Sequence, residues 1–295
     1  MILGLALYWV VENEHQPFRE NSMLRKTSVS ALIACASAFA SLPSLSQSTP
    51  EVTLTRLDCG TQVMNDISVR FTDTFAYPGQ KLPFTFSCYL IKHGEDYMLW
   101  DTGHSMSAGP PAPKTSIVDQ LAQLKVKPEQ IKFIGISHFH ADHTGQLPTF
   151  PGASLLIGKG DWDGINATPA MAGANVAAFG HWMNGGGKME VLSGDKDIFG
   201  DATVVIMRTP GHTPGHNSLM VRLKDAGNFL LTGDLAHFHE NYDSNGVPSF
   251  NFHRGDTVAS LERFKKAAAN LKATVVIQHD PRDIGKLPAF PIAAK

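Results

Sequence analysis

The sequence predicts an α+β protein in which two β-sheets pack together and helices cover their outer faces, within one domain. Two observations support this prediction. Short runs of β-branched and aromatic residues recur along the chain and outnumber the segments with helical periodicity. Several of these runs end directly in a polar cluster, which is typical of a site built along one edge of a β scaffold.

The first predicted strands cover residues 54–57, 84–91 and 97–100, because each run is rich in β-branched or aromatic side chains. The third strand ends at the turn Asp101-Thr102-Gly103, and a stiff, proline-rich loop follows at residues 109–113.

Two helices are predicted. The first opens at Ser116, because Ser116 and Asp119 form a capping box and Pro128 lies beyond the segment. Its apolar residues fall on one face: Ile117, Val118, Leu121 and Leu124. The second is long, is expected to be capped by Asp256, and carries Val258, Leu261, Phe264, Ala268 and Leu271.

Further strands are predicted over residues 131–136, 155–157, 204–206, 229–231 and 275–277. Four strands lead into polar side chains: Ile136 into His138, Met207 into His212, Leu231 into Asp234, and Ile277 into His279. We therefore expect these side chains at one edge of the sheets.

Composition is that of an ordinary globular protein, with 43% hydrophobic and 18% charged residues among 295. The net charge of −2 provides no basic field, so a nucleic-acid partner is not expected. The sequence leaves the oligomeric state open, and a homodimer is compatible with it. The 13 histidines far outnumber the three cysteines.

Residues 1–40 are interpreted as an upstream extension and a signal peptide, and residues 41–295 as a single domain. With Met23 as the true start, a short positive region precedes an apolar run and the small-residue site Ala38-Phe39-Ala40. A membrane anchor is less favoured, because the run falls short of about 18 residues. We expect a periplasmic or secreted protein without stable membrane insertion after removal of the signal.

Export would leave Cys59 and Cys88 in the mature chain. They could pair in an oxidising compartment, but cysteine is also a common small buried hydrophobe. Cys88 lies in a strand-like run, which favours a free core residue over a disulfide.

The densest group of metal-binding side chains is His138, His140, Asp142 and His143, within six positions. This segment cannot form one helical face, because residues i and i+2 point apart on a helix. In an extended loop, His138 and His140 project to the same side. Imidazoles and a carboxylate are ligands that zinc and similar divalent ions prefer.

Three later segments supply the remaining donors: His212 on a tight turn, Asp234 after a strand, and His279 after another strand. A single tetrahedral ion cannot use all seven groups and keep a position open for water. Two ions about 3.5–4 Å apart can, with Asp234 able to bridge them.

At these residues the chain resembles the metallo-β-lactamase superfamily over roughly residues 52–291. The resemblance implies an αββα four-layer sandwich with a metal pair at its edge, in a catalytic domain covering residues 41–295. It also implies a ligand set for each ion: His138, His140 and His212 for the first, Asp142, His143 and His279 for the second, and Asp234 between them. The implied cofactors are two divalent ions, Zn²⁺ or a zinc–iron or zinc–cobalt mixture.

Within this superfamily the chain is similar to the N-acyl homoserine lactonase group. That similarity implies a small-molecule lactone substrate and an attacking hydroxide, with Asp142 as the residue that accepts and returns a proton. The segment 61–83, with Phe71, Phe75 and Tyr77, is either an apolar wall for the acyl chain or an ordinary surface loop.

One position departs from the lactonase pattern. Several lactonases have a tyrosine three residues after the bridging aspartate, where His237 stands here. An imidazole N–H could donate to the developing oxyanion, and a solvent-exposed role is equally compatible with the sequence. The other histidines near the motifs, His216, His239 and His253, are expected to support ligands or lie at the surface.

Two other hydrolases are the main alternatives. A secreted metallo-β-lactamase is less favoured, because the subclass with the full HxHxDH motif typically lacks an aspartate at the position of Asp234. A phosphotriesterase resembling methyl parathion hydrolase shares that aspartate. A non-catalytic metal-dependent binding protein is the remaining alternative. It is not favoured, because such a protein is expected to lack at least one metal-binding residue of the set, and all seven are present.

Overall fold

The computed structural model describes residues 50–295, so the predicted extension and signal peptide lie outside the described residues. Two β-sheets form the centre of the molecule. The first sheet has the order β1 (Val52–Met64), β2 (Leu82–His93), β3 (Asp96–Trp100), β4 (Ile131–Gly135), β5 (Ser154–Gly158), β6 (Met189–Leu192). The second has the order β11 (Thr274–Val276), β10 (Gly227–Leu231), β9 (Asn217–Leu223), β8 (Val204–Arg208), β7 (Lys196–Asp197).

Strand alternation divides the side chains of the first sheet between two cores. Tyr89 and Ile91 of β2 face the second sheet, whereas Cys88 and Leu90 face the opposite side. The core between the sheets also contains Met98, Trp100, Val204, Ile206, Leu219, Val221 and Leu231. These two inner layers are the β-sandwich that the sequence predicts.

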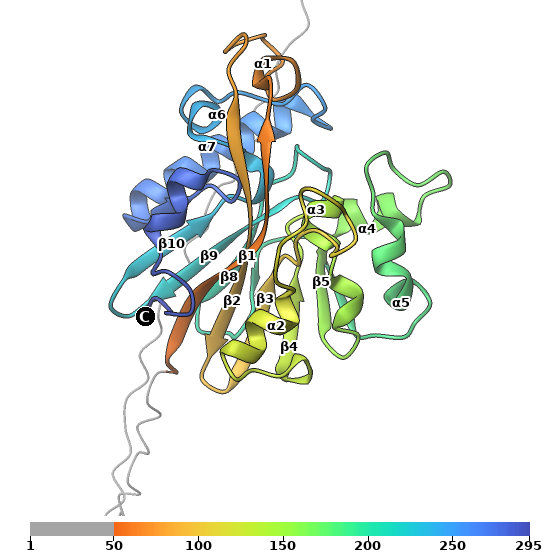
Figure 1. Cartoon of the computed structure of the whole chain (residues 1–295), viewed down its shortest axis with the longest axis vertical. Helices are drawn as coiled ribbons and strands as arrows, with labels where there is room; N and C mark the ends of the chain where they lie inside the picture. The colour runs from red at the N-terminus through yellow and green to blue at the C-terminus, as the bar shows by residue number, and fades with distance from the viewer. Residues whose placement is uncertain (1–49) are drawn as a thin grey trace, which may run out of the picture. The chain divides into compact units, whose positions relative to one another are not determined.

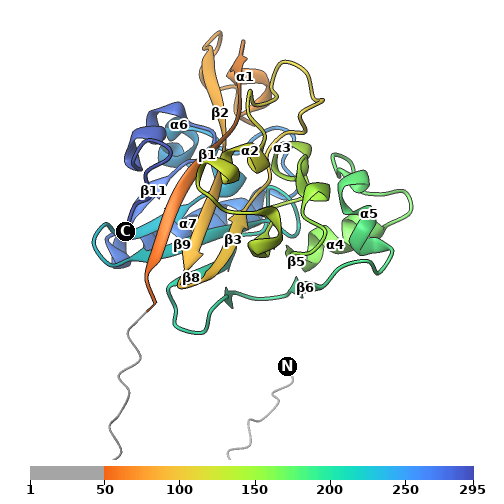
Figure 2. The same ribbon diagram turned by 60° about the horizontal axis from the view of Figure 1, so that its bottom comes forward.

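Helices cover both outer faces (Figures 1 and 2). On the first sheet, α2 (Ile117–Gln123) buries Ile117 and Leu121 in the same core as Leu99 of β3. On the second sheet, α7 (Arg254–Leu271) buries Leu261, Phe264 and Ala268 against Met207, Met220 and Leu230. The four-layer αββα prediction is confirmed. None of the helices between residues 50 and 295 combines the length and apolarity needed to cross a membrane.

The N-cap of α2 is the predicted residue, whereas the N-cap of α7 differs from the prediction. Ser116 is the N-cap of α2, and its Oγ accepts a hydrogen bond from Asp119 N at 3.1 Å. The predicted cap of α7 is wrong: His253 is the N-cap, and its Nδ1 accepts from Asp256 N at 3.1 Å. Asp256 instead lies in the first turn, where its negative charge suits the helix dipole.

The β1–β2 hairpin extends well beyond the other strands of its sheet (Figure 1). Its distal part pairs residues 61–64 with residues 82–85, after an irregularity between Asp58 and Thr61. The short helix α1 (Ile67–Arg70) lies at the far end. The distal part of the hairpin, together with α1, thus lies at the edge of the sheets where the predicted donors are expected.

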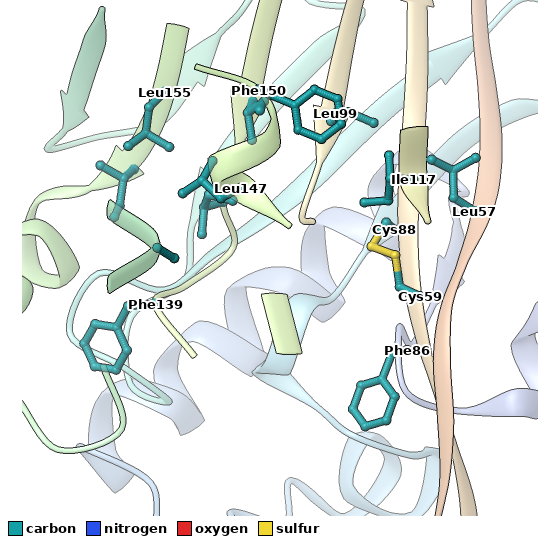
Figure 3. Packing of buried hydrophobic residues seen from close by; sticks show 14 of the residues in the cluster. Leu57, Cys59, Phe86, Cys88, Leu99, Ile117, Phe139, Leu147, Phe150 and Leu155 are labelled. Carbon is teal, nitrogen blue, oxygen red and sulfur yellow. A yellow bond between two sulfur atoms is a disulfide. The ribbon is translucent and has the colours of Figure 1, made fainter. Parts of the chain in front are cut away.

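The expectation of unpaired cysteines is wrong. Cys59 and Cys88 form a disulfide with Cα atoms 6.0 Å apart. Both residues are buried, and Figure 3 shows the bond among Leu57, Ile117 and Phe86. The position of Cys88 in a core strand was read as evidence for a free thiol, but β1 and β2 are adjacent antiparallel strands, which brings Cys59 within reach.

Candidate metal centre

Strand direction brings the predicted donors to one edge. In the second sheet β8, β10 and β11 run the same way, because β10 and β11 are parallel and both β8 and β10 are antiparallel to β9. Their carboxyl ends therefore meet, and His212, Asp234 and His279 follow them. In the first sheet β4 ends at Gly135, and the loop to α3 (Ala141–Thr144) carries the histidine-rich segment to the same place.

One donor set contains His138, His140, His212 and Asp234, whose ligand atoms all lie within 4.8 Å of one another. Nδ1 of His140 is 2.8 Å from Nε2 of His138 and 3.1 Å from Nε2 of His212. Nε2 of His212 is 3.2 Å from Asp234 Oδ2. Three imidazole nitrogens and one carboxylate oxygen thus converge on one point.

A second set contains Asp142, His143, Asp234 and His279, under the same 4.8 Å limit. Asp234 uses its other oxygen here: Oδ1 is 3.1 Å from Nε2 of His143 and 2.8 Å from Nε2 of His279. Asp142 Oδ2 lies 3.5 Å from His143 Nε2 and 3.7 Å from His279 Nε2. The structure therefore brings all seven predicted residues together, with Asp234 shared by both sets.

The imidazoles are oriented by hydrogen bonds at their other nitrogen. His143 Nδ1 donates to Asp101 Oδ2 at 2.8 Å, and His279 Nδ1 donates to the Thr85 carbonyl at 3.0 Å. His216 donates from Nδ1 to the Thr209 carbonyl at 2.9 Å, so its Nε2 accepts from Asp234 N at 2.8 Å. Each bond fixes a tautomer and turns Nε2 toward the donor sets or toward the backbone of Asp234.

Asp161 in α4 (Lys159–Asn166) joins two ligand loops. Its carboxylate accepts from Phe139 N at 3.0 Å, between His138 and His140. It also accepts from Thr213 Oγ1 at 2.9 Å and Gly215 N at 2.7 Å, in the loop of His212. Burial nevertheless raises the pKa of Asp161 to about 7, against the three donors that favour its ionised form.

Burial keeps the imidazoles of the first donor set neutral. It lowers the pKa of His138 well below the usual range and the pKa of His140 to about 4, with His212 adding repulsion at His140. The pKa of His212 is also lowered by burial, although Asp234 opposes this shift. Neutral imidazoles present lone pairs, which is the form that binds a cation.

The second set has the opposite balance. Burial opposes charge on His143 and His279, but the carboxylate of Asp234, with Asp142, outweighs burial and raises the pKa of both. Burial likewise opposes ionisation of Asp142 and Asp234, yet the surrounding imidazoles hold the pKa of both carboxyls below the usual range. Two anionic carboxylates here require positive charge nearby.

The residues present fit a pair of divalent cations. Nε2 of His143 is buried and has no hydrogen-bond partner within residues 50–295, although two carboxylates lie beside it. Nε2 of His138 and Nδ1 of His140 face each other at 2.8 Å with lowered pKa values, so no charged imidazolium supports that contact. Several neutral imidazole nitrogens directed at a common point are typical of metal ligands.

Four of the seven donors, His140, Asp142, Asp234 and His279, line a cavity of about 500 Å³. Its wall is largely aromatic and includes Phe71, Phe84, Phe86 and Phe250. A larger hollow of about 660 Å³ lies between Pro50 and Lys295 and contains none of the donors, so the smaller cavity is the candidate substrate site. The predicted aromatic wall is therefore correct for Phe71, whereas Phe75 is exposed and Tyr77 packs against Phe238.

His237 is buried, which excludes the solvent-exposed alternative. Its Nε2 lies 3.1 Å from Asp234 Oδ2, and its Nδ1 has no hydrogen-bond partner in the described part of the chain. The ring also lines the cavity and packs against Phe71 at 5.0 Å. The other expected positions hold: His216 supports Asp234, while His253 is exposed and His239 pairs with Asp283.

Sequence reasoning missed several residues of the site. Asp101 was treated only as a turn residue, although it orients His143, accepts from Ser137 N at 2.7 Å, and accepts from Gln278 Nε2 at 2.9 Å. Asp161 and His104, a cavity residue, were not singled out. An acidic residue directly after an apolar strand is a weak signal that could have identified Asp101.

Comparison with known proteins agrees with this geometry. The model of the metallo-beta-lactamase superfamily matches residues 84–279. N-acyl homoserine lactonase AttM of Rhizobium radiobacter is 34% identical over 179 residues, covering 56% of this chain and 64% of that protein. An N-acyl homoserine lactonase of a Bacillus species is 28% identical over 220 residues, covering 69% and 84%.

Solved structures show the same fold. A quorum-quenching N-acyl homoserine lactone lactonase is 25% identical and has a TM-score of 0.70, covering 84% of this chain and 99% of that one. The chain spans just under two thirds of the length of the AttM relative. Because the family model covers well over half of its residues, and the fold and donor sets agree with it, this chain belongs to the metallo-β-lactamase superfamily.

Proposed function

We propose that this protein is a dinuclear metal hydrolase that opens the lactone ring of N-acyl homoserine lactones, a quorum-quenching activity. One observation carries the proposal: Asp234 directs Oδ2 to one set of imidazoles and Oδ1 to another. A carboxylate shared in this way suits two cations and not one. The relatives named N-acyl homoserine lactonase support the choice of substrate.

His138, His140 and His212 would hold one ion, Asp142, His143 and His279 the other, and Asp234 both. Zinc suits this set of imidazoles and carboxylates, and a zinc–iron or zinc–cobalt mixture uses the same ligands. When bound, the ions would lower the pKa of a water molecule toward neutrality and polarise the lactone carbonyl. The cysteines of the described residues are paired in a disulfide, so they offer no thiolate to a metal.

Two residues of this chain would handle protons and charge. Asp142 is the more accessible carboxylate, with 23% of its side chain exposed against 5% for Asp234, and its lowered pKa leaves it ionised at neutral pH. It would accept a proton from the attacking water and return it to the ring oxygen that leaves. Burial lowers the pKa of His237, so its imidazole is neutral and has one N–H; this proton lies on Nε2, beside Asp234 Oδ2, and would be donated to the developing oxyanion from that position.

A side-by-side assay tests the proposed substrate. Purified, metal-loaded protein is given an N-acyl homoserine lactone, nitrocefin and paraoxon at matched concentrations. We expect kcat/KM to be highest for the lactone. Dominant turnover of nitrocefin or paraoxon would replace the lactonase proposal with the β-lactamase or phosphotriesterase alternative.

We also propose that the protein is exported through its N-terminal signal. The disulfide between Cys59 and Cys88 supports an oxidising compartment. Mass spectrometry of protein from the periplasm and the medium should find an N-terminus near residue 41. A cytoplasmic protein that retains residues 23–40 would contradict export.

A homodimer is tested by light scattering on the same sample.

A further inference from the structure

Arg70 is a charged cavity residue that the donor sets leave unused. It lies at the C-terminal end of α1, and its side chain lines the cavity. The guanidinium makes no salt bridge and no hydrogen bond with any residue between 50 and 295. The carboxylates that line the cavity, Asp142 and Asp234, both belong to the donor sets. The lining of the cavity therefore includes an exposed cation that has no ionic partner in the described part of the chain.

The guanidinium lies close to two aromatic rings, although Arg70 is exposed and has no ionic partner within residues 50–295. Its Cζ lies 5.2 Å from the centre of the Phe250 ring and 6.0 Å from that of Phe71. The backbone around it is also fixed, because Ser249 N donates to the Arg70 carbonyl at 3.0 Å and Asp73 N donates to the Val247 carbonyl at 2.8 Å. A guanidinium that already lies against aromatic rings loses less freedom when it binds an acceptor than one without such contacts.

Aromatic rings lie between this cation and the donor sets. The Phe250 ring is 5.6 Å from the His212 ring and 5.9 Å from the His237 ring, and its centre also lies 5.2 Å from Arg70 Cζ. Phe71 contacts both Phe250 and His237. The cavity thus passes from the carboxylates through an apolar section to a group that only donates hydrogen bonds.

We propose that Arg70 is a specificity-determining residue that binds an oxygen acceptor on the acyl chain of the substrate. The inference rests on the proposed lactonase function. With the lactone carbonyl at the donor sets, the acyl chain extends along the aromatic wall, and a ketone oxygen on that chain would accept from the guanidinium. An unsubstituted chain offers no such acceptor and gains only apolar contact.

The test compares two lactones of equal chain length, N-hexanoyl and N-(3-oxohexanoyl) homoserine lactone. They are assayed with the wild type, Arg70→Met and Arg70→Lys. Arg70→Met should lower kcat/KM for the 3-oxo substrate about tenfold, the scale of one hydrogen bond to a charged group, and change the unsubstituted substrate less than about twofold. Arg70→Lys should lie between, because it keeps the charge without the planar fork.

Arg222→Met, an exposed arginine on β9, is the matched control and should leave both substrates unchanged. Metal content and circular dichroism establish that each variant is folded and loaded. Equal effects of Arg70→Met on the two lactones, or none, would overturn the role of Arg70 while the lactonase proposal stands. Failure of the wild type to open either lactone would instead reject the proposed function, and this inference with it.

Discussion

The position of Asp234 in the site is constrained by its neighbours on both sides of the turn. Gly233 precedes it with φ = +58°, and a Cβ atom there would lie 2.7 Å from Nε2 of His216. The same nitrogen accepts from the backbone of Asp234. A glycine turn and a buried imidazole together place one carboxylate between two donor sets, which no single local interaction would achieve.

Replacing Asp234 with Ala should remove metal and activity together. Both donor sets lose a ligand, so the loss of kcat/KM should exceed about 100-fold, the upper range for residues that only orient a ligand. Metal content by mass spectrometry and lactone turnover are measured on the same sample. A variant that keeps two ions per chain and full activity would remove the bridging role.

Changing His237 to Ala should lower kcat for the lactone by at least about tenfold, toward the roughly 100- to 1000-fold loss typical of a removed oxyanion donor. KM should be nearly unchanged, because the apolar residues of the cavity wall still contact the substrate. His181→Ala, at an exposed histidine of α5 (Gly180–Met183), is the control for an imidazole outside the cavity. An unchanged kcat in His237→Ala would exclude His237 from the mechanism.

Asp161 gives a prediction with a defined pH dependence. Its pKa is about 7 when folded and about 3.9 when unfolded. The folded protein therefore binds more protons between about pH 4 and pH 7, and the contribution of Asp161 to the free energy of unfolding falls as pH rises through this window. Above about pH 7 the contribution becomes constant.

Asp161→Asn lacks this titration and also turns an amide NH₂ toward a donor in one of the two ligand loops. Its difference from the wild type in unfolding free energy should change by up to about 1.4 kcal/mol per pH unit between about pH 5 and pH 7. Urea unfolding at several pH values measures this. A pH-independent difference would show that Asp161 is already ionised across the range.

At the scale of elements, caps decide where the helices begin. Ser116 Oγ accepts from Asp119 N, and Gln146 Oε1 accepts from Ile117 N at 2.9 Å, so two of the free N–H groups of α2 have acceptors. Ser116→Ala should lower the free energy of unfolding by about 1 kcal/mol. Thermal and urea unfolding measure this. A larger loss would indicate that Ser116 supports more than the helix start.

The elements also show what the sequence can and cannot predict. Runs such as residues 84–91 and 97–100 can be predicted, because they are rich in the aromatic and apolar side chains that a largely buried strand needs. Strand β9 was not predicted, since Asn217 and Ser218 begin it with polar side chains. Both side chains are buried: Ser218 Oγ donates to the Thr232 carbonyl at 2.8 Å, and Asn217 Nδ2 donates to the Gly215 carbonyl at 2.9 Å, whereas Asn217 Oδ1 has no hydrogen-bond partner within residues 50–295.

Within the site, the limit of prediction lies in long-range pairing. The seven donors stand out by type and spacing, whereas Asp101, Asp161 and Gln278 act only because distant segments meet. Gln278 has three such partners. Its amide nitrogen donates to Asp101, and its amide oxygen accepts from Trp100 Nε1 at 2.9 Å and from Gly233 N at 3.0 Å. Apart from the weak signal of an acidic residue directly after a strand at Asp101, such partners have no signature in the local sequence.

For the molecule as a whole, the disulfide joins the two strands of the long hairpin. It closes a loop with a sequence separation of 29 residues. Replacing Cys59 and Cys88 together with Ala should therefore lower the free energy of unfolding by roughly 3–4 kcal/mol in the loop-entropy description. Urea unfolding of the variant and the oxidised wild type provides the measurement, and equal midpoints would contradict it.

The layered architecture separates the donor residues from most of the cavity wall. The donors follow β4, β8, β10 and β11, which are buried between packed layers, whereas Met64, Arg70 and Phe71 of the wall come from the hairpin and α1. His279 is the point of contact, since its backbone carbonyl accepts from Thr85 N at 3.0 Å. Changes near the hairpin tip should therefore alter substrate preference more than metal retention.

This separation has a consequence for how such an enzyme can diverge. Exchange of residues 65–81 between homologues would give a chimaera that keeps the metal-binding residues of one parent and has the cavity wall of the other parent at the hairpin tip. Related enzymes can thus come to accept substrates of different length or polarity through substitutions in this one surface segment, while their metal-binding residues and activity are kept throughout.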